Sequence, residues 1–337
     1  MTQMRLNCLV ALLATFCVGQ PVKAEKFSAV VAFGDSLSDL GNTFNYLGDY
    51  TSYWLADYNS YYYDQGRWSD GPVWVEDLVR LFHFAALQPN NGFNLYGTDF
   101  AWGGSTSGDG YTSFTVLGLE YELPNLQTQV ENYLNLFSTE YARMPDISER
   151  LFTIWSGGND VIYLVQGLPG TSKKLEVTPE DIAKHIDSAV SKLYQAGGRY
   201  FLVPNLPPLG EKPNYRTIKD YRREANDFVN QYTPLIHAEL VQLPQKLSGA
   251  TVVELDVFKL FTNVIKYPDN YGFTNVKVPA FTSDLYNPPH FGKIVRNPSQ
   301  YLFWDGTHPT LVGHEIVGKS AYDAVQAASA LLLSMGQ

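Results

Sequence analysis

Two short stretches of this sequence combine residue types that could attack an ester or amide carbonyl. Ser36 follows an apolar run, in Phe-Gly-Asp-Ser-Leu, and Asp305 and His308 stand three residues apart in Trp-Asp-Gly-Thr-His-Pro. A serine hydroxyl is a poor nucleophile at neutral pH and needs an adjacent base. His308 can supply that base while Asp305 orients its imidazole. The two stretches therefore predict a catalytic triad of Ser36, His308 and Asp305.

The tetrahedral intermediate of such a reaction also needs hydrogen-bond donors for its oxyanion. The candidate donors are the backbone N–H of Ser36, that of Gly104, and the side-chain amide of Asn159 in Gly-Gly-Asn-Asp. Gly103, the other half of the glycine pair, is the alternative to Gly104. The glycines around this pair lack the spacing and the following lysine of a phosphate-binding loop.

Each stretch also has an ordinary structural explanation when it is taken alone. Ser36 could cap a helix or turn, the glycine pair could form a tight turn, and Asn159 could end a strand in an Asx turn. His314 is the second choice for the base, but its place six residues further along favours packing within a helix. The remaining histidines have no acidic residue at a matching spacing and are expected to be structural or exposed: His83, His185, His237 and His290.

Strand-like and helix-like stretches alternate along the chain. Apolar runs predict strands over 28–33, 150–155, 199–207 and 250–257, and apolar stripes of helical period predict helices over 69–82, 177–198, 220–243 and 311–333. Asp70 and Thr178 are the expected N-caps of the first two helices. Strands separated by helices of this length imply an α/β fold with a mostly parallel sheet. Ligands of such sheets bind beyond the carboxyl ends of the strands, where the polar stretches fall.

Two long segments interrupt this alternation. Tyr46–Trp68 is rich in aromatic residues, and Tyr267–Gln300 is rich in proline and asparagine. Loops of this length are usually functional or disordered, and the aromatic content argues against disorder. The tyrosine-rich segment could pack over the sheet, line an acyl pocket or present stacking surfaces to sugar rings.

The N-terminus resembles a secretory signal peptide. Arg5 precedes an apolar stretch over 6–18, and Val22-Lys23-Ala24 offers a small-x-small cleavage site, so residues 1–24 are expected to be removed after Ala24. The remaining residues 25–337 show no linker or repeat and are expected to form a single domain, secreted or periplasmic. Lipidation at Cys17 is the competing interpretation, but Phe16 occupies a position where a small residue is usual.

Composition excludes several classes of function. Cys8 and Cys17 are the only cysteines, so removal of the signal leaves neither a thiol nucleophile nor thiolate metal sites. Residues 1–24 hold two basic and no acidic residues, so their loss changes the formal charge from −10 to −12. This acidity argues against nucleic acid or an anionic membrane as the main partner. No stretch after the signal is long and apolar enough to predict stable membrane insertion, and no metal or other cofactor is expected.

The four blocks Gly34-Asp35-Ser36-Leu37, Gly103-Gly104, Gly158-Asn159-Asp160 and Asp305-x-x-His308-Pro309 together resemble the GDSL, or SGNH, hydrolase family over essentially the whole mature chain. The stretches around 66–78, 203–213 and 303–310 are similar to a branch with bacterial phospholipase/acyltransferases, thermolabile haemolysins and acetylesterases. The resemblance implies a flavodoxin-like three-layer α/β/α sandwich. It also implies the triad named above and an oxyanion hole of Ser36, Gly104 and Asn159. Ser105 departs from the pattern, because many relatives have alanine there.

The expected activity is therefore hydrolysis of carboxylic esters through an acyl-enzyme, without a cofactor. Lipid esters and acylated carbohydrates both remain possible substrates, and the acidic surface and aromatic segment favour short-chain or carbohydrate-linked esters. The alternatives are an acyltransferase, in which an alcohol replaces water, and a non-catalytic glycan-binding protein on the same fold. The intact set of Ser36, Asn159, Asp305 and His308 argues against the last. The sequence does not indicate an oligomeric state.

Overall fold

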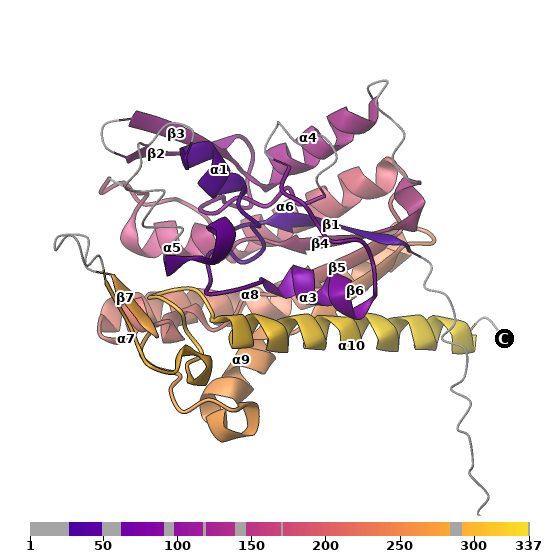
Figure 1. Ribbon diagram of the computed structural model, residues 1–337. Coiled ribbons are helices and arrows are strands. Elements are labelled where there is room, and N and C mark those ends of the chain that lie inside the picture. Colours follow the sequence, from indigo (N-terminus) through magenta and orange to yellow (C-terminus); the bar gives the residue numbers. More distant parts are fainter. Residues whose placement is uncertain are drawn as a thin grey trace, which may run out of the picture.

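The computed structural model is built around a four-stranded sheet (Figure 1). It describes residues 27–48, 62–90, 98–116, 119–138, 146–169, 171–283 and 292–335. The strands are β1 (Ala29–Gly34), β4 (Arg150–Trp155), β5 (Tyr200–Pro204) and β6 (Thr251–Leu255), in the order β1-β4-β5-β6. All three pairings are parallel. The four predicted strands and the predicted parallel sheet are thus confirmed, and the proposed signal peptide lies outside the described residues.

Apolar side chains on both faces of the sheet create two cores, because successive residues of a strand point to opposite sides. On β1, Val31 and Phe33 enter one core, whereas Val30 and Ala32 enter the other. The first core is covered by α4 (Leu126–Ser138), α6 (Pro179–Gln195) and α8 (Lys219–Lys246). The second is covered by α3 (Trp74–Leu81), α9 (Val257–Lys266) and α10 (Leu311–Met335). The result is the predicted three-layer α/β/α arrangement, with α4 and α6 above β1 and β4 and with α3 and α10 below them in Figure 1.

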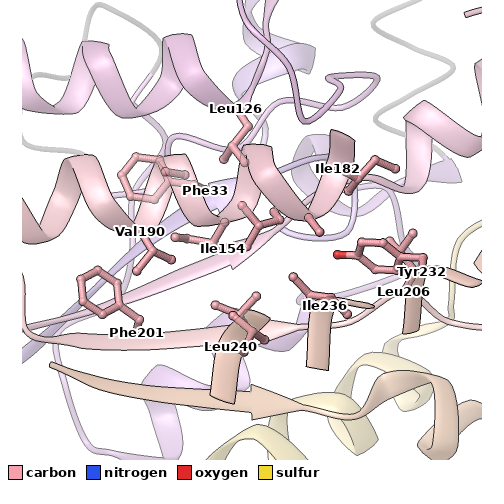
Figure 2. Packing of buried hydrophobic residues seen from close by; sticks show 14 of the residues in the cluster. Phe33, Leu126, Ile154, Ile182, Val190, Phe201, Leu206, Tyr232, Ile236 and Leu240 are labelled. Atoms are coloured by element: carbon pink, nitrogen blue, oxygen red, sulfur yellow. The ribbon is translucent and has the colours of Figure 1, made fainter. Parts of the chain in front are cut away.

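Figure 2 shows the first of these cores. Phe33, Ile154 and Phe201 project from three neighbouring strands, and they meet the apolar stripes of helices α6 and α8, represented by Ile182, Val190, Ile236 and Leu240. All seven side chains are at most 3% exposed. Burial of a side chain of this size stabilises the fold by about 1.5–3 kcal/mol. This packing fixes the strands whose ends carry the polar stretches.

Helix starts follow the sequence signals at one site and depart from them at another. Thr178 caps α6 by accepting the backbone N–H of Asp181, as predicted. The prediction that Asp70 caps the first helix is wrong. Helix α3 begins at Trp74, and the carboxylate that accepts at its start belongs to Glu76. Asp70 instead accepts the N–H of Leu311 at the start of α10, at 2.7 Å. Gly71 and Pro72 separate Asp70 from the first turn of α3, and the fold brings the later helix to it.

Several elements have no counterpart in the predictions. They are the antiparallel hairpin of β2 (Tyr111–Val116) and β3 (Leu119–Pro124), the short pair β7 (Phe281–Ser283) and β8 (Gly292–Ile294), and the helices α1 (Asn42–Gly48), α4, α5 (Gly158–Gln166), α7 (Pro213–Arg216) and α9. Single 3-10 turns lie at Asp64–Gly66, Ile147–Glu149, Leu209–Glu211, Pro268–Tyr271 and Pro298–Gln300. None of the helices within the described ranges combines the length and the apolar character that crossing a bilayer requires.

Candidate active site

The predicted site residues meet at the carboxyl ends of β1 and β4. Ser36 lies two residues beyond β1, and Asn159 lies in the first turn of α5, just after β4. Gly104 belongs to a turn that Trp102 and Ser105 hold against the end of β1, since the N–H of Trp102 and the hydroxyl of Ser105 both donate to the carbonyl of Gly34. The parallel pairing of β1 with β4 places these three segments side by side.

Asp305, His308 and Ser36 form a continuous chain of hydrogen bonds. His308 Nε2 lies 2.9 Å from Ser36 Oγ, and His308 Nδ1 lies 2.7 Å from Asp305 Oδ2. The other carboxylate oxygen accepts the backbone N–H groups of Thr307 and His308, both at 2.7 Å. Because an ionised carboxylate only accepts, Nδ1 must carry the proton, which leaves Nε2 free to accept the Ser36 proton. The geometry therefore suits a serine activated by a histidine base.

The charge of Asp305 is maintained by its surroundings. Burial by itself raises the pKa of this carboxyl, but the adjacent His308 and the two backbone N–H groups outweigh burial and lower the pKa to about 2. The carboxylate is therefore ionised throughout the pH range in which the imidazole works. It can hold the ring in position and stabilise its cationic form.

Two backbone N–H groups and one side-chain amide are available as donors for an oxyanion. Within the described part of the chain, the N–H groups of Ser36 and Gly104 have no acceptor. The Asn159 amide donates to the carbonyl of Ser105 at 2.9 Å, which fixes its orientation and leaves its second N–H available. Gly103 is less suited, because its N–H already donates to Asp39 and to Thr43. Gly104 also has a φ of +86°, a conformation that favours glycine.

The sequence did not single out two aromatic residues that contact the triad. The Tyr63 hydroxyl donates to Asp305 Oδ2 at 2.8 Å, the same oxygen that accepts from His308. The Trp68 ring packs against the His308 ring, with centroids 5.3 Å apart and an interplanar angle of 33°. A Cβ on Gly103 would lie only 2.3 Å from Trp68 Nε1, so Trp68 sits between the histidine and the glycine turn. Both aromatics come from the tyrosine-rich segment, of which residues 49–61 lie outside the described ranges.

The second interrupting segment also reaches this site. Tyr62 stacks on Phe281, with ring centroids 4.6 Å apart and an interplanar angle of 20°. Phe281 in turn stacks on Trp304, the residue just before Asp305. The described ends of the two segments therefore pack on each other beside the triad. High aromatic content was the only sequence signal for this arrangement, and it did not indicate which rings take part.

The other histidines take structural places. His314 is fully buried, and its Nδ1 accepts the backbone N–H of Trp74, so it packs as expected and does not reach Ser36. His237 Nδ1 lies 2.6 Å from Glu254 on β6, and that bond raises the pKa of His237. His237 is exposed, as expected, but Glu254, which lies at no matching spacing in the sequence, approaches it in the fold. Sequence spacing could not reveal a partner on a different element. His290 lies outside the described residues.

Two clefts border His308. The first, of about 620 Å³, reaches Ser36 and Asn159 and is lined mainly by apolar side chains, among them Trp155, Phe261 and Ile265. The second, of about 770 Å³, carries more polar groups, and its wall includes Tyr63, Asn214, Phe281 and Thr282. An ester seated over Ser36 would therefore lie in the apolar cleft, with the more polar one next to it at His308.

Asp35, next to the nucleophile, is an unusual buried carboxyl. Burial raises its pKa to about 7, although the N–H of Leu37 donates to it. The Asp35 carboxyl releases its proton near pH 3.8 in the unfolded chain, but only near pH 7 in the folded protein. The unfolding free energy of the protein therefore falls as pH rises from about 4 to about 7. We expect Asp35→Asn to be more stable than the wild type above pH 7, by up to about 4 kcal/mol in unfolding free energy relative to the difference at low pH, because asparagine has no proton to lose.

The measurement for Asp35→Asn is urea unfolding of both proteins at pH 4.5, 5.5, 6.5 and 7.5. The difference in unfolding free energy, variant minus wild type, should increase steadily across this series. Asp39 and Asp99 are present in both proteins, so the effects of their burial cancel in the difference. A difference that stays constant with pH would contradict an elevated pKa at Asp35.

Comparison with known proteins places this fold and site in one family. The family model of GDSL-like lipase/acylhydrolase matches residues 30–321. The GDSL esterase/lipase APG of Arabidopsis thaliana is 26% identical over 343 residues, which cover 92% of this chain and 94% of that protein. The anther-specific proline-rich protein APG of Arabidopsis thaliana is 28% identical over 86% of this chain, but the match spans only 60% of that longer protein.

A solved structure of a lipolytic G-D-S-L family protein from Veillonella parvula covers 88% of this chain and 96% of its own, with 12% identity and a TM-score of 0.41. The narrower resemblance to bacterial phospholipase/acyltransferases and haemolysins stays a prediction. The match of the family model extends from β1 into α10 and so includes all four polar blocks. The chain therefore belongs to the GDSL-like lipase/acylhydrolase family, a family of serine hydrolases that act on carboxylic esters.

Proposed function

We propose that this protein is an exported serine esterase that hydrolyses carboxylic esters through an acyl-enzyme on Ser36. The observation that carries the proposal is the hydrogen-bonded chain from Ser36 Oγ through His308 to Asp305, at the rim of an apolar cleft. Family membership agrees with it. A glycan-binding protein without catalytic activity would have no use for a serine held 2.9 Å from a correctly oriented histidine.

The proposed reaction has two halves. In the first, Ser36 Oγ attacks the ester carbonyl while His308 Nε2 takes its proton, and Asp305 stabilises the resulting imidazolium. The N–H groups of Ser36, Gly104 and Asn159 stabilise the oxyanion. The intermediate collapses when the C–O bond to the alcohol breaks and His308 returns the proton to the departing oxygen. In the second half, a water molecule gives a proton to His308 and attacks the acyl carbon. The bond from that carbon to Ser36 Oγ then breaks, His308 returns the proton to Ser36 Oγ, and the acid leaves.

We infer further that the acyl group enters the apolar cleft and is longer than acetyl. The cleft contains both Ser36 and Asn159, and apolar side chains such as Trp155, Phe261 and Ile265 make up most of its walls, whereas an acetyl group offers them only one methyl group. Each methylene transferred from water to such a wall contributes about 0.8 kcal/mol, or roughly fourfold in binding. This inference modifies the preference for short-chain or carbohydrate-linked esters that the acidic surface and the aromatic segment suggested.

A series of 4-nitrophenyl esters from acetate to palmitate tests the chain length. We expect kcat/KM to rise from acetate to about hexanoate or octanoate, since each added methylene gains contact with the cleft, and to decline for longer chains. A steep fall beyond butyrate would contradict the inference and support the short-chain preference. Undiminished activity on palmitate and on phosphatidylcholine would support the lipid-ester alternative.

Export rests on the sequence alone. The proposed signal over residues 1–24 ends at Ala24, so the exported protein should begin at Glu25. Intact-mass measurement of the protein from the culture medium or the periplasm tests this. Retention of residues 1–24, or a lipid attached at Cys17, would contradict it.

A further inference from the structure

Lys212 is a buried cation on the wall of the cleft that holds Ser36. It follows the 3-10 turn Leu209–Glu211, its residue is only 4% exposed, and it lines the apolar cleft. Lysine is almost never buried to this extent unless it is paired, because a charge loses its hydration when it is removed from water. A buried lysine beside a nucleophile therefore calls for an explanation.

The contacts of Lys212 leave part of its bonding capacity unused. Its ammonium donates to Thr307 Oγ1 at 3.3 Å and lies 4.0 Å from the centroid of the Tyr215 ring. An ammonium carries three donors, and these two contacts occupy two of them. Among the described residues, no carboxylate lies within ion-pair distance of Lys212. Asp305 attracts it from further away, but the oxygens of that carboxylate already accept from His308, Thr307 and Tyr63.

The cleft around Lys212 offers little to balance its charge. Burial lowers the pKa of Lys212 to about 8, against the attraction of Asp305, so most of the side chain is still cationic at neutral pH. Asp35 lines the same cleft, but its own raised pKa keeps much of it neutral there. The other walls are chiefly apolar, as at Phe261 and Phe303. Lys212 thus lines the space assigned above to the acyl group, and its ammonium is held there by Thr307, another residue of the same wall.

We propose that Lys212 is a specificity-determining residue that binds an anionic oxygen, a carboxylate, on the acyl group of the substrate. The preferred acyl group then has methylenes against the apolar walls and a negative charge several bonds from the ester carbonyl, as in a half-ester of a dicarboxylic acid. This inference rests on the proposed esterase function and on the acyl group occupying this cleft. A purely structural lysine that only anchors Thr307 would show no preference for charge.

Matched pairs of substrates distinguish a lysine that binds a carboxylate of the substrate from one that only anchors Thr307. The mono-4-nitrophenyl esters of glutaric and adipic acid are compared with the 4-nitrophenyl esters of pentanoic and hexanoic acid, which have the same chain lengths without the carboxylate. We expect the ratio of kcat/KM, acidic over neutral, to favour the acidic ester in at least one pair. Lys212→Met should lower that ratio about ten- to a hundredfold, the usual range for a hydrogen bond to a charged group. Lys212→Arg should retain most of it.

An equal loss of activity on both members of each pair in Lys212→Met would overturn the proposal and leave Lys212 a structural role. A wild-type ratio that favours the neutral ester in every pair would also overturn it. Failure of the esterase function itself would look different, because hydrolysis of the neutral esters would then be absent, or would persist unchanged in Ser36→Ala.

The wild-type protein provides a second readout that needs no variant to fold. The acidic-over-neutral ratio should fall as pH rises from 7 to 9.5, since the ammonium loses its proton around pH 8. Asp305, His308, Asp35 and Tyr215 also face this region. Asp305 is ionised throughout this range, and burial raises the pKa of Tyr215. Ionisation of Asp35, whose pKa is about 7, adds a negative charge to the cleft and also lowers the ratio, so the fall between pH 8 and 9.5, where Asp35 is already ionised, is the part assigned to Lys212. A ratio that stays constant over this range would overturn the proposal.

Discussion

Ser36→Ala is expected to lower kcat for ester hydrolysis by about six orders of magnitude, leaving only the residual acceleration that the oxyanion hole and substrate binding provide. The variant removes the only atom within hydrogen-bond distance of His308 Nε2 in the described structure, and no acyl-enzyme can form without it. Loss of one hydroxyl should leave the fold intact, because Ser36 Oγ makes no other bond that the structure describes. The measurement is steady-state hydrolysis of 4-nitrophenyl hexanoate, with circular dichroism to verify folding.

Ser188→Ala provides the matched control. Ser188 lies on α6, where its hydroxyl donates to Gln127, away from His308. This variant should retain the wild-type kcat and should still show rapid release of nitrophenol in the first turnover if deacylation is slow. Hydrolysis at the wild-type rate by Ser36→Ala would show that Ser36 is not the nucleophile and would leave the proposed function without support.

Asp305→Asn is expected to lower kcat by about four orders of magnitude while leaving KM within a few-fold of wild type. The ionised carboxylate can only accept hydrogen bonds, which places the imidazole proton on Nδ1 and leaves Nε2 as the base. An amide can instead donate to Nδ1, which would put the proton on Nε2 and remove the acceptor that faces Ser36. The measurement is kcat and KM for 4-nitrophenyl hexanoate between pH 6 and 9.

Tyr63→Phe tests how much the charge of Asp305 matters when the position of its carboxylate is unchanged. The tyrosine hydroxyl is one of the donors to Asp305, and Thr307 and His308 still hold the carboxylate when it is removed. We expect kcat to fall less than tenfold and the acidic limb of the pH–rate profile to move to higher pH, because a carboxylate with fewer donors attracts the imidazole proton more strongly. A loss as large as that of Asp305→Asn would mean that Tyr63 has a direct role in the reaction.

Local sequence was sufficient for most of the sheet. The strand at 150–155 was predicted with the bounds that β4 has, because an uninterrupted apolar run between polar turns is typical of a strand covered on both faces. The N-cap at Thr178 was equally local, since the capping side chain and its acceptors lie within four residues. The sequence also predicts the site residues Ser36, Gly104, Asn159, Asp305 and His308, because polar residues at the carboxyl ends of parallel strands converge.

Local sequence was not sufficient where the deciding partner lies far along the chain. Helix α5 begins at Gly158, in a stretch for which the sequence predicts the end of a strand and an oxyanion donor but no helix. Asp70 was assigned to the neighbouring helix, but it caps α10, which begins 241 residues later. The residue types in both stretches are plain from the sequence. Each result depends on which segments the packed layers bring together.

The sequence by itself determined the chemistry available to this protein: a serine, a histidine and an aspartate at the ends of apolar strands, with glycine and asparagine turns beside them. Only the tertiary structure decided that Tyr63 and Trp68 support the triad and that Lys212 lies unpaired in the cleft next to Ser36. The physical reason is that hydrogen bonds and burial depend on distance in space. Residue type and periodicity specify a strand or a turn, but the neighbours of a buried side chain are fixed only when the layers pack.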